Sequence, residues 1–169
     1  MSTAVSPIPR TSASAAKTIL LSGFIAGTMD ILAAILVYSV IMQKVTAAQI
    51  LHGIAAGVFG KTTVGSSAVM ALIGLAFHYF IAFCFAIAYF FAYPHIPFLR
   101  KQRIISGLLY GIFVWAVMNF IVVPMSNAYH APFAWPSAIR AAAILMICIG
   151  LPISLITNRY YKSKFVLVR

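Results

Sequence analysis

Two ionisable side chains lie inside long apolar stretches of this sequence and are the first candidates for chemistry. Asp30, in the stretch GFIAGTMDILAAIL, is the only acidic residue among 169. His78 lies near the middle of another apolar stretch, so the two side chains are expected at similar depth if both stretches cross a membrane as helices. Because an Asp and a His that share a proton or a hydrogen bond cost less in hydrocarbon than either alone, we predict that they pair.

The sequence leaves two interpretations of this pair open. An intramembrane ionisable residue is by default a candidate for moving a proton or a cation, which predicts that Asp30 and His78 form a relay. In the other interpretation Asp30 is only a clasp that hydrogen-bonds a neighbouring helix. Tyr38 and Asn119 are possible polar neighbours toward the outer side. Arg140, near the outer end of the last apolar stretch, either reaches lipid headgroups or faces inward to bind an anionic group.

Other kinds of site find little support among the residues. Haem held by two histidines needs both at a depth that brackets one iron, and only His78 lies deep in an apolar stretch. Catalysis by two carboxylates or by two metal ions needs acidic residues that this chain lacks. We therefore expect no cofactor, no metal site and no catalytic residue, and an enzyme ranks behind the other function classes.

The apolar stretches define the architecture that positions these residues. The sequence is 63% hydrophobic and 8% charged, whereas a soluble domain carries about 25% charged residues. Four runs are long enough to cross a bilayer as helices, and they cover about 18–42, 67–93, 104–125 and 137–157. A run at about 46–59 is too short to cross. We predict an all-α membrane protein with four transmembrane helices and a short interfacial or re-entrant helix between the first and the second.

The charge distribution predicts how this bundle is oriented. Residues 1–16 are expected to be a disordered tail, residues 17–160 the bundle, and residues 161–169 a basic tail. Nine of the 12 Lys and Arg residues fall on the side of the two tails and the second loop. Because positively charged loops stay cytoplasmic, both termini are expected there, with anionic lipid headgroups as partners. Basic residues placed between or beyond the spans do not predict nucleic-acid binding.

Small residues predict where the helices touch. Lipid tails are as apolar as Leu, so membrane helices associate through close packing at small side chains. Asp30 lies at helical spacing from two such glycines and is expected to point into the bundle. Four spans enclose little interior, which predicts a homo-oligomer or a membrane-protein partner. The glycines expected at helix contacts are Gly23, Gly27, Gly74, Gly107 and Gly111, with Gly53 and Gly57 offering a further small face in the short helix.

Several segments resemble a group of small bacterial inner-membrane proteins. GFIAGTMD, LHGIAAGVFG, HYFIAFCFAIAYFFA and GLLYGIFVWAVMNFIVVPMS, followed by GLPISL, are similar to YagU-like proteins over residues 18 to about 160. The resemblance implies four helices in a bacterial inner membrane. It implies no reaction, so no site residue is carried over from it.

Together these features predict a small multi-pass membrane protein, expected in the bacterial inner membrane. The function we expect is proton- or cation-linked transport or permeation through the Asp30–His78 pair. The alternative is a non-catalytic accessory or assembly subunit of a membrane complex, in which the small-residue faces dock a partner.

Overall fold

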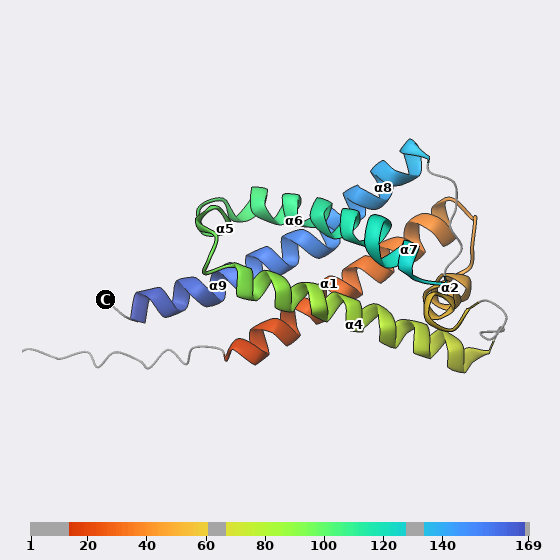
Figure 1. Cartoon of the computed structure of the whole chain (residues 1–169), viewed down its shortest axis with the longest axis horizontal. Coiled ribbons are helices and arrows are strands. Elements are labelled where there is room, and N and C mark those ends of the chain that lie inside the picture. Colours follow the sequence, from red (N-terminus) through yellow and green to blue (C-terminus); the bar gives the residue numbers. More distant parts are fainter. Residues whose placement is uncertain (1–13, 61–66, 128–133, 168–169) are drawn as a thin grey trace, which may run out of the picture.

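The chain folds into long helices that pack side by side (Figure 1). The structure is a computed structural model that describes residues 14–60, 67–127 and 134–167. Residues 1–13, most of the predicted N-terminal tail, and residues 168–169, the end of the predicted basic tail, lie outside the described residues. Every regular element within the described ranges is helical, which confirms the predicted all-α fold class.

Four helices are long and apolar enough to cross a membrane, so the chain is a small multi-pass integral membrane protein. The first span joins α1 (Ala15–Ala34) to the π-helical segment η1 (Ile35–Ile41), and the second is α4 (Ala68–Ala92). The third joins α6 (Arg103–Val117), the π-helical segment η2 (Met118–Val122) and α7 (Val123–Met125). The fourth joins α8 (Trp135–Leu145), the π-helical segment η3 (Met146–Gly150) and α9 (Leu151–Leu167).

The predicted short helix is α2 (Ala47–Phe59), whose 13 residues cannot cross a bilayer. Its first turn is held by a capping box, because the Thr46 hydroxyl accepts from the Gln49 N–H at 3.2 Å and the Gln49 side chain accepts from the Thr46 N–H at 2.8 Å. The helix packs on α4, where a Cβ at Gly74 would overlap the Leu51 carbonyl. Gly53 has open space around it, so the glycine that admits this contact belongs to α4.

Prolines account for two of the π-helical segments. Pro124 follows η2 and Pro152 follows η3. A proline has no N–H to donate to the carbonyl four residues earlier, and its ring crowds that carbonyl, which belongs to Phe120 in η2 and to Cys148 in η3. The helix widens at these places instead of breaking. No proline follows η1, which simply ends the first span.

The ends of the elements gather on two opposite faces of the molecule (Figure 1). The start of α1, the one-turn helix α5 (Pro97–Lys101) and the end of α9 lie on one face, which we call the terminal face. α2, α7 and the start of α8 lie on the other, the α2 face. The last helix continues to Leu167, beyond the predicted span of about 137–157 and into a polar stretch of the sequence.

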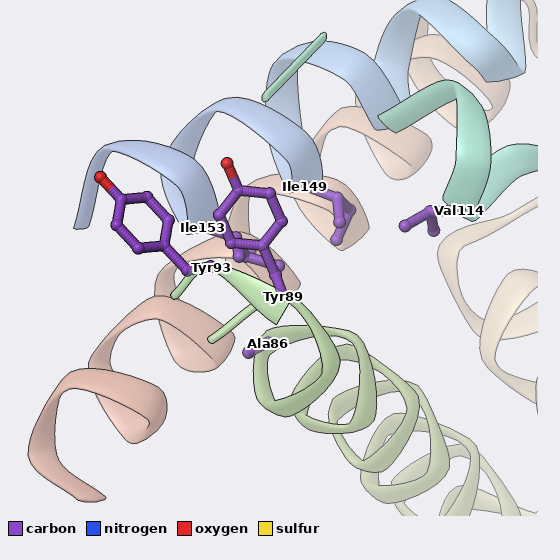
Figure 2. Close-up of a cluster of buried hydrophobic side chains, with 7 residues drawn as sticks. Ala86, Tyr89, Tyr93, Val114, Ile149 and Ile153 are labelled. Atoms are coloured by element: carbon purple, nitrogen blue, oxygen red, sulfur yellow. The ribbon is translucent and has the colours of Figure 1, made fainter. Parts of the chain in front are cut away.

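The buried core lies on the terminal-face half of the bundle, where α1, α4, α6 and the fourth span meet. Tyr89 and Tyr93 extend from α4 toward α9 and fill most of this region (Figure 2). Ile153 of α9 is fully buried against them. The complete cluster consists of Ala26, Ala86, Tyr89, Tyr93, Val114, Ile149 and Ile153.

Candidate functional site

The site begins at the contact between α1 and α4. A Cβ at Gly27 would lie 2.9 Å from the ring of Tyr79 and 3.2 Å from Ala82, so the two helices meet closely at this glycine. Beside it, the Thr28 and Tyr79 hydroxyls are 2.8 Å apart and hydrogen-bond each other. Gly23, one turn earlier, faces Phe83 in the same way. Aromatic rings of α4 therefore pack against glycines of α1.

His78 joins the two helices through the backbone. Its Nε2 atom lies 2.8 Å from the carbonyl oxygen of Gly27. A carbonyl oxygen can only accept, so Nε2 carries the hydrogen in this contact. The other ring nitrogen, Nδ1, takes no part in this contact.

A cavity of about 90 Å³ opens beside this contact in the interior of the bundle. A water molecule needs about 10–15 Å³ of volume of this kind, so the cavity is large enough to hold water. All four spans and α2 contribute to its wall, so it lies where the elements converge. The wall consists of Asp30, Ile54, His78, Ile81, Ala82, Phe85, Val114, Met118, Leu145 and Ile149.

Asp30 and His78 are the ionisable side chains of this wall, and both are half-buried. No hydrogen bond or ion pair joins them within the part of the chain that the structure describes. The predicted direct pair is therefore not what the structure shows, since the Gly27 carbonyl takes the His78 Nε2–H. The two side chains instead share one small, mainly apolar cavity and are its two ionisable groups. A carboxylate and an imidazole placed in this way can exchange a proton or bind a cation through water.

The other predicted polar residues lie away from this cavity. Asn119, in η2, is exposed and donates to the carbonyl of Trp115 in its own helix at 2.8 Å. Tyr38 lies in η1, and Arg140 lies in α8 with its Nε atom buried and without a partner among the described residues. None of the three lines the cavity wall.

The remaining predicted glycines also lie where elements come close. A Cβ at Gly107 would lie 3.0 Å from the carbonyl oxygen of Gly150 and from the Ser154 side chain. Gly111, one turn further along α6, faces the backbone of Met146 at the start of η3. The third and fourth spans thus pack backbone to backbone next to the cavity.

A group of buried hydroxyls lies between the cavity and the terminal face, and the sequence analysis did not find it. The Tyr89 hydroxyl bonds Ser154 at 2.8 Å and Ser106 at 3.0 Å. Ser154 in turn donates to the carbonyl of Arg103 at 2.6 Å. The indication that the sequence offered was that Ser106 lies next to Gly107, a glycine expected at a helix contact. Their common partner, Tyr89, cannot be identified from sequence spacing.

Tyr110 lies between these buried hydroxyls and the cavity. Its hydroxyl donates to the carbonyl of Phe85, a residue of the cavity wall, at 2.7 Å. Its ring meets the ring of Tyr89 edge-on, with the centroids 4.7 Å apart. Polar groups therefore extend from the cavity toward the terminal face with aromatic rings between them.

Among the described residues, no group of three His, Cys, Asp or Glu side chains is placed to hold a metal ion. The chemistry that the site offers is that of one carboxylate, one imidazole and nearby hydroxyls. Comparisons of the chain with protein-family models, with curated proteins and with solved structures found no match.

Proposed function

We propose that this membrane protein moves a proton or a small cation across the bilayer, with Asp30 and His78 as the groups that hold it. The observation that supports the proposal is the interior cavity of about 90 Å³, which the only carboxylate of the chain shares with a histidine. A charged side chain in hydrocarbon is costly, and such residues are characteristic of ion and proton pathways. An apolar side chain at position 30 would serve packing at lower cost.

The surroundings of the cavity fit a stepwise transfer. Toward the terminal face, the hydroxyls of Tyr110 and Tyr89 and the Ser106–Ser154 pair supply groups that both donate and accept. Toward the α2 face, Ile54 of the short helix α2 closes the wall. Movement of α2 on α4 would open that side, which makes α2 the gate of the proposed pathway.

The second candidate is an accessory or assembly subunit, and one contact favours it. His78 donates to the Gly27 carbonyl and so ties α4 to α1, which is the behaviour of a packing clasp. In that role Asp30 adds a polar neighbour to the clasp, and the small-residue faces serve a partner subunit or a second copy.

The proposed location follows from composition and from the resemblance to YagU-like proteins. Nine of the 12 basic residues lie on the side of the termini and the second loop, which supports a cytoplasmic terminal face. We place the chain in a bacterial inner membrane with both termini in the cytoplasm.

Flux measurements in liposomes test the proposal. The purified chain is reconstituted with a pH-sensitive dye inside, and proton or K⁺ flux is recorded under a gradient. Wild type should conduct above empty liposomes and Asp30→Asn should not, because the amide keeps the shape but cannot release a proton or neutralise a cation. Asn119→Leu, outside the cavity, is the matched control and should conduct as wild type does.

Two results would reject transport. Normal flux through Asp30→Asn would show that the carboxylate is not used, and a wild type no more permeable than empty liposomes would leave no pathway to explain. The native mass of the protein from its own membrane then decides whether a co-purifying partner supports the accessory interpretation.

A further inference from the structure

A second pocket, unrelated to the Asp30 cavity, lies between α1 and α9 near the terminal face. Its volume is about 220 Å³. Basic, hydroxyl and apolar side chains line it together, and all of them come from the first two turns of α1 and from residues 156–163 of α9. The lining residues are Lys17, Thr18, Leu21, Ile156, Arg159, Tyr160 and Ser163.

The two cations of this pocket have no acidic side chain to neutralise them. Lys17 and Arg159 are both exposed, and each comes from a different helix. Asp30 is the only acidic side chain of the chain and lines the other cavity. A pocket with two positive charges and no carboxylate attracts an anion.

Two hydroxyls of the lining, those of Thr18 and Ser163, already donate within their own helices. Thr18 donates to the carbonyl of Ser14 at 3.2 Å, and Ser163 donates to the carbonyl of Tyr160 at 2.8 Å. Because each hydroxyl has a single hydrogen, neither has another to offer. The Lys17 ammonium, with three N–H donors, and the Arg159 guanidinium, with five, are the charged groups of the lining that can bind phosphate oxygens.

The pocket lies at the depth of the membrane surface. Asn158, next to Arg159, donates to the hydroxyl of Tyr93, the first residue after α4. Arg159 is therefore level with the end of the second span. Leu21 lies one turn further into the bundle than Lys17, and Ile156 about one turn further than Arg159. The basic end of the pocket thus lies at headgroup level and its apolar end in the hydrocarbon.

We propose that this pocket is a binding site for an anionic phospholipid. Lys17 and Arg159 hold the phosphate, while Leu21 and Ile156 contact the first part of an acyl chain. Basic pockets between membrane helices on the cytoplasmic side bind such headgroups. A free phosphate ion would satisfy the two cations but would leave the apolar end of the pocket unused.

Native mass spectrometry of the full chain in a mild detergent tests this site. Phosphatidylglycerol, phosphatidylcholine with the same acyl chains, or inorganic phosphate is titrated, and the bound fraction is recorded. The test variant is Lys17→Gln with Arg159→Gln. The matched control is Arg100→Gln with Lys101→Gln, which removes the same charge from exposed positions of α5 on the same face.

The expected result is a site for phosphatidylglycerol in wild type and in the control. The test variant should bind this lipid about tenfold more weakly, since each basic residue near the surface contributes to anionic-lipid binding. Excess inorganic phosphate should not displace it. Each single variant, Lys17→Gln or Arg159→Gln, should lose part of the affinity, which gives a second measurement if the double variant does not fold.

Three outcomes would overturn the proposal. Equal loss in the test and control variants would show that only the overall charge of the face matters. Equal binding of phosphatidylcholine would remove the role of the anionic headgroup. Displacement by inorganic phosphate would identify a site for free anions. Flux through the Asp30 cavity is a separate measurement, so neither result decides the other.

Discussion

The Nε2 atom of His78 lies 2.8 Å from the carbonyl oxygen of Gly27, which places the α4 histidine against the α1 backbone one turn before Asp30. The same imidazole therefore holds two helices together and forms part of the cavity wall. The contact with Gly27 needs only Nε2, so the proton transfer that we propose would use the other ring nitrogen. Substitutions can separate the two roles.

His78→Gln should keep the protein stable and stop flux. The glutamine Nε2–H can replace the donor to the Gly27 carbonyl, whereas an amide carries no exchangeable charge. We expect the free energy of unfolding in detergent to stay within about 0.5 kcal/mol of wild type and His78→Leu to lower it by about 1 kcal/mol. His95→Gln, in the exposed turn after α4, is the control. Undiminished flux in His78→Gln would exclude the imidazole from the pathway.

Gly74→Ala and Gly53→Ala should have opposite effects although both lie in helices. A Cβ at Gly74 would overlap the Leu51 carbonyl, so α2 must shift away, and overpacking of this kind costs about 1–3 kcal/mol. A Cβ at Gly53 meets nothing within 4 Å, and Ala is better than Gly in a helix interior by up to about 1 kcal/mol. Hydrogen exchange of the α2 amides should be faster in Gly74→Ala and unchanged or slower in Gly53→Ala. Equal exchange in the two variants would contradict the packing of α2 on Gly74.

The hydrogen bonds among the buried hydroxyls of Tyr89, Ser106 and Ser154 should contribute to stability cooperatively. Tyr89→Phe removes the bonds to Ser106 and Ser154 and should lower the free energy of unfolding by about 1 kcal/mol. Ser154→Ala in the Tyr89→Phe background should cost less than in wild type, with a coupling of at least about 0.5 kcal/mol in a double-mutant cycle. Tyr38→Phe is the control, because the Tyr38 hydroxyl has no hydrogen-bond partner among the described residues. Strict additivity would mean that the bonds are energetically independent.

The proposed orientation can be read from thiol labelling. In a chain with Cys84→Ala and Cys148→Ala, a single cysteine is introduced as Lys44→Cys or Lys101→Cys, both at exposed positions. A membrane-impermeant maleimide applied to intact cells should label the first, on the α2 side. The second, beside the basic second loop, should react only after the cells are opened. The reverse pattern would place the termini outside.

The number of the helices and their positions along the chain could be predicted, because they depend on local composition. In a membrane, a run of about 20 apolar residues satisfies its backbone hydrogen bonds by forming a spanning helix. The four spans and the short α2 therefore follow from counting residues. The end of α9 could not be predicted in this way. Hydropathy marks where a helix leaves the membrane, whereas the hydrogen bonds that end a helix do not depend on that boundary.

Two residues of the candidate cavity, Asp30 and His78, could be named from the sequence, but their contacts could not. Asp30 and His78 line one cavity because both lie deep in their spans, a property that the sequence displays. The hydrogen bond from His78 goes to a backbone carbonyl. Because every residue has a backbone carbonyl, no pattern of side chains predicts which one is bound. The partners of Tyr89 depend on the rotation of α6 and α9 about their axes, which sequence spacing alone does not determine.

The π-helical segment η3 sets the rotation of the second half of the fourth span. A π-helical turn contains about one residue more than an α-helical turn. The side chains that follow Met146–Gly150 are therefore turned by about 100° from where an uninterrupted α-helix would put them. Through this offset Ser154 meets Tyr89, Asn158 meets Tyr93, and Arg159 lines the pocket between α1 and α9. Loss of one residue within Met146–Gly150 would restore an α-helical turn and leave all three side chains facing their present neighbours, because the deletion and the lost offset cancel. Loss of a residue from α9 between η3 and Ser154, with η3 kept, would instead turn all three by about 100°.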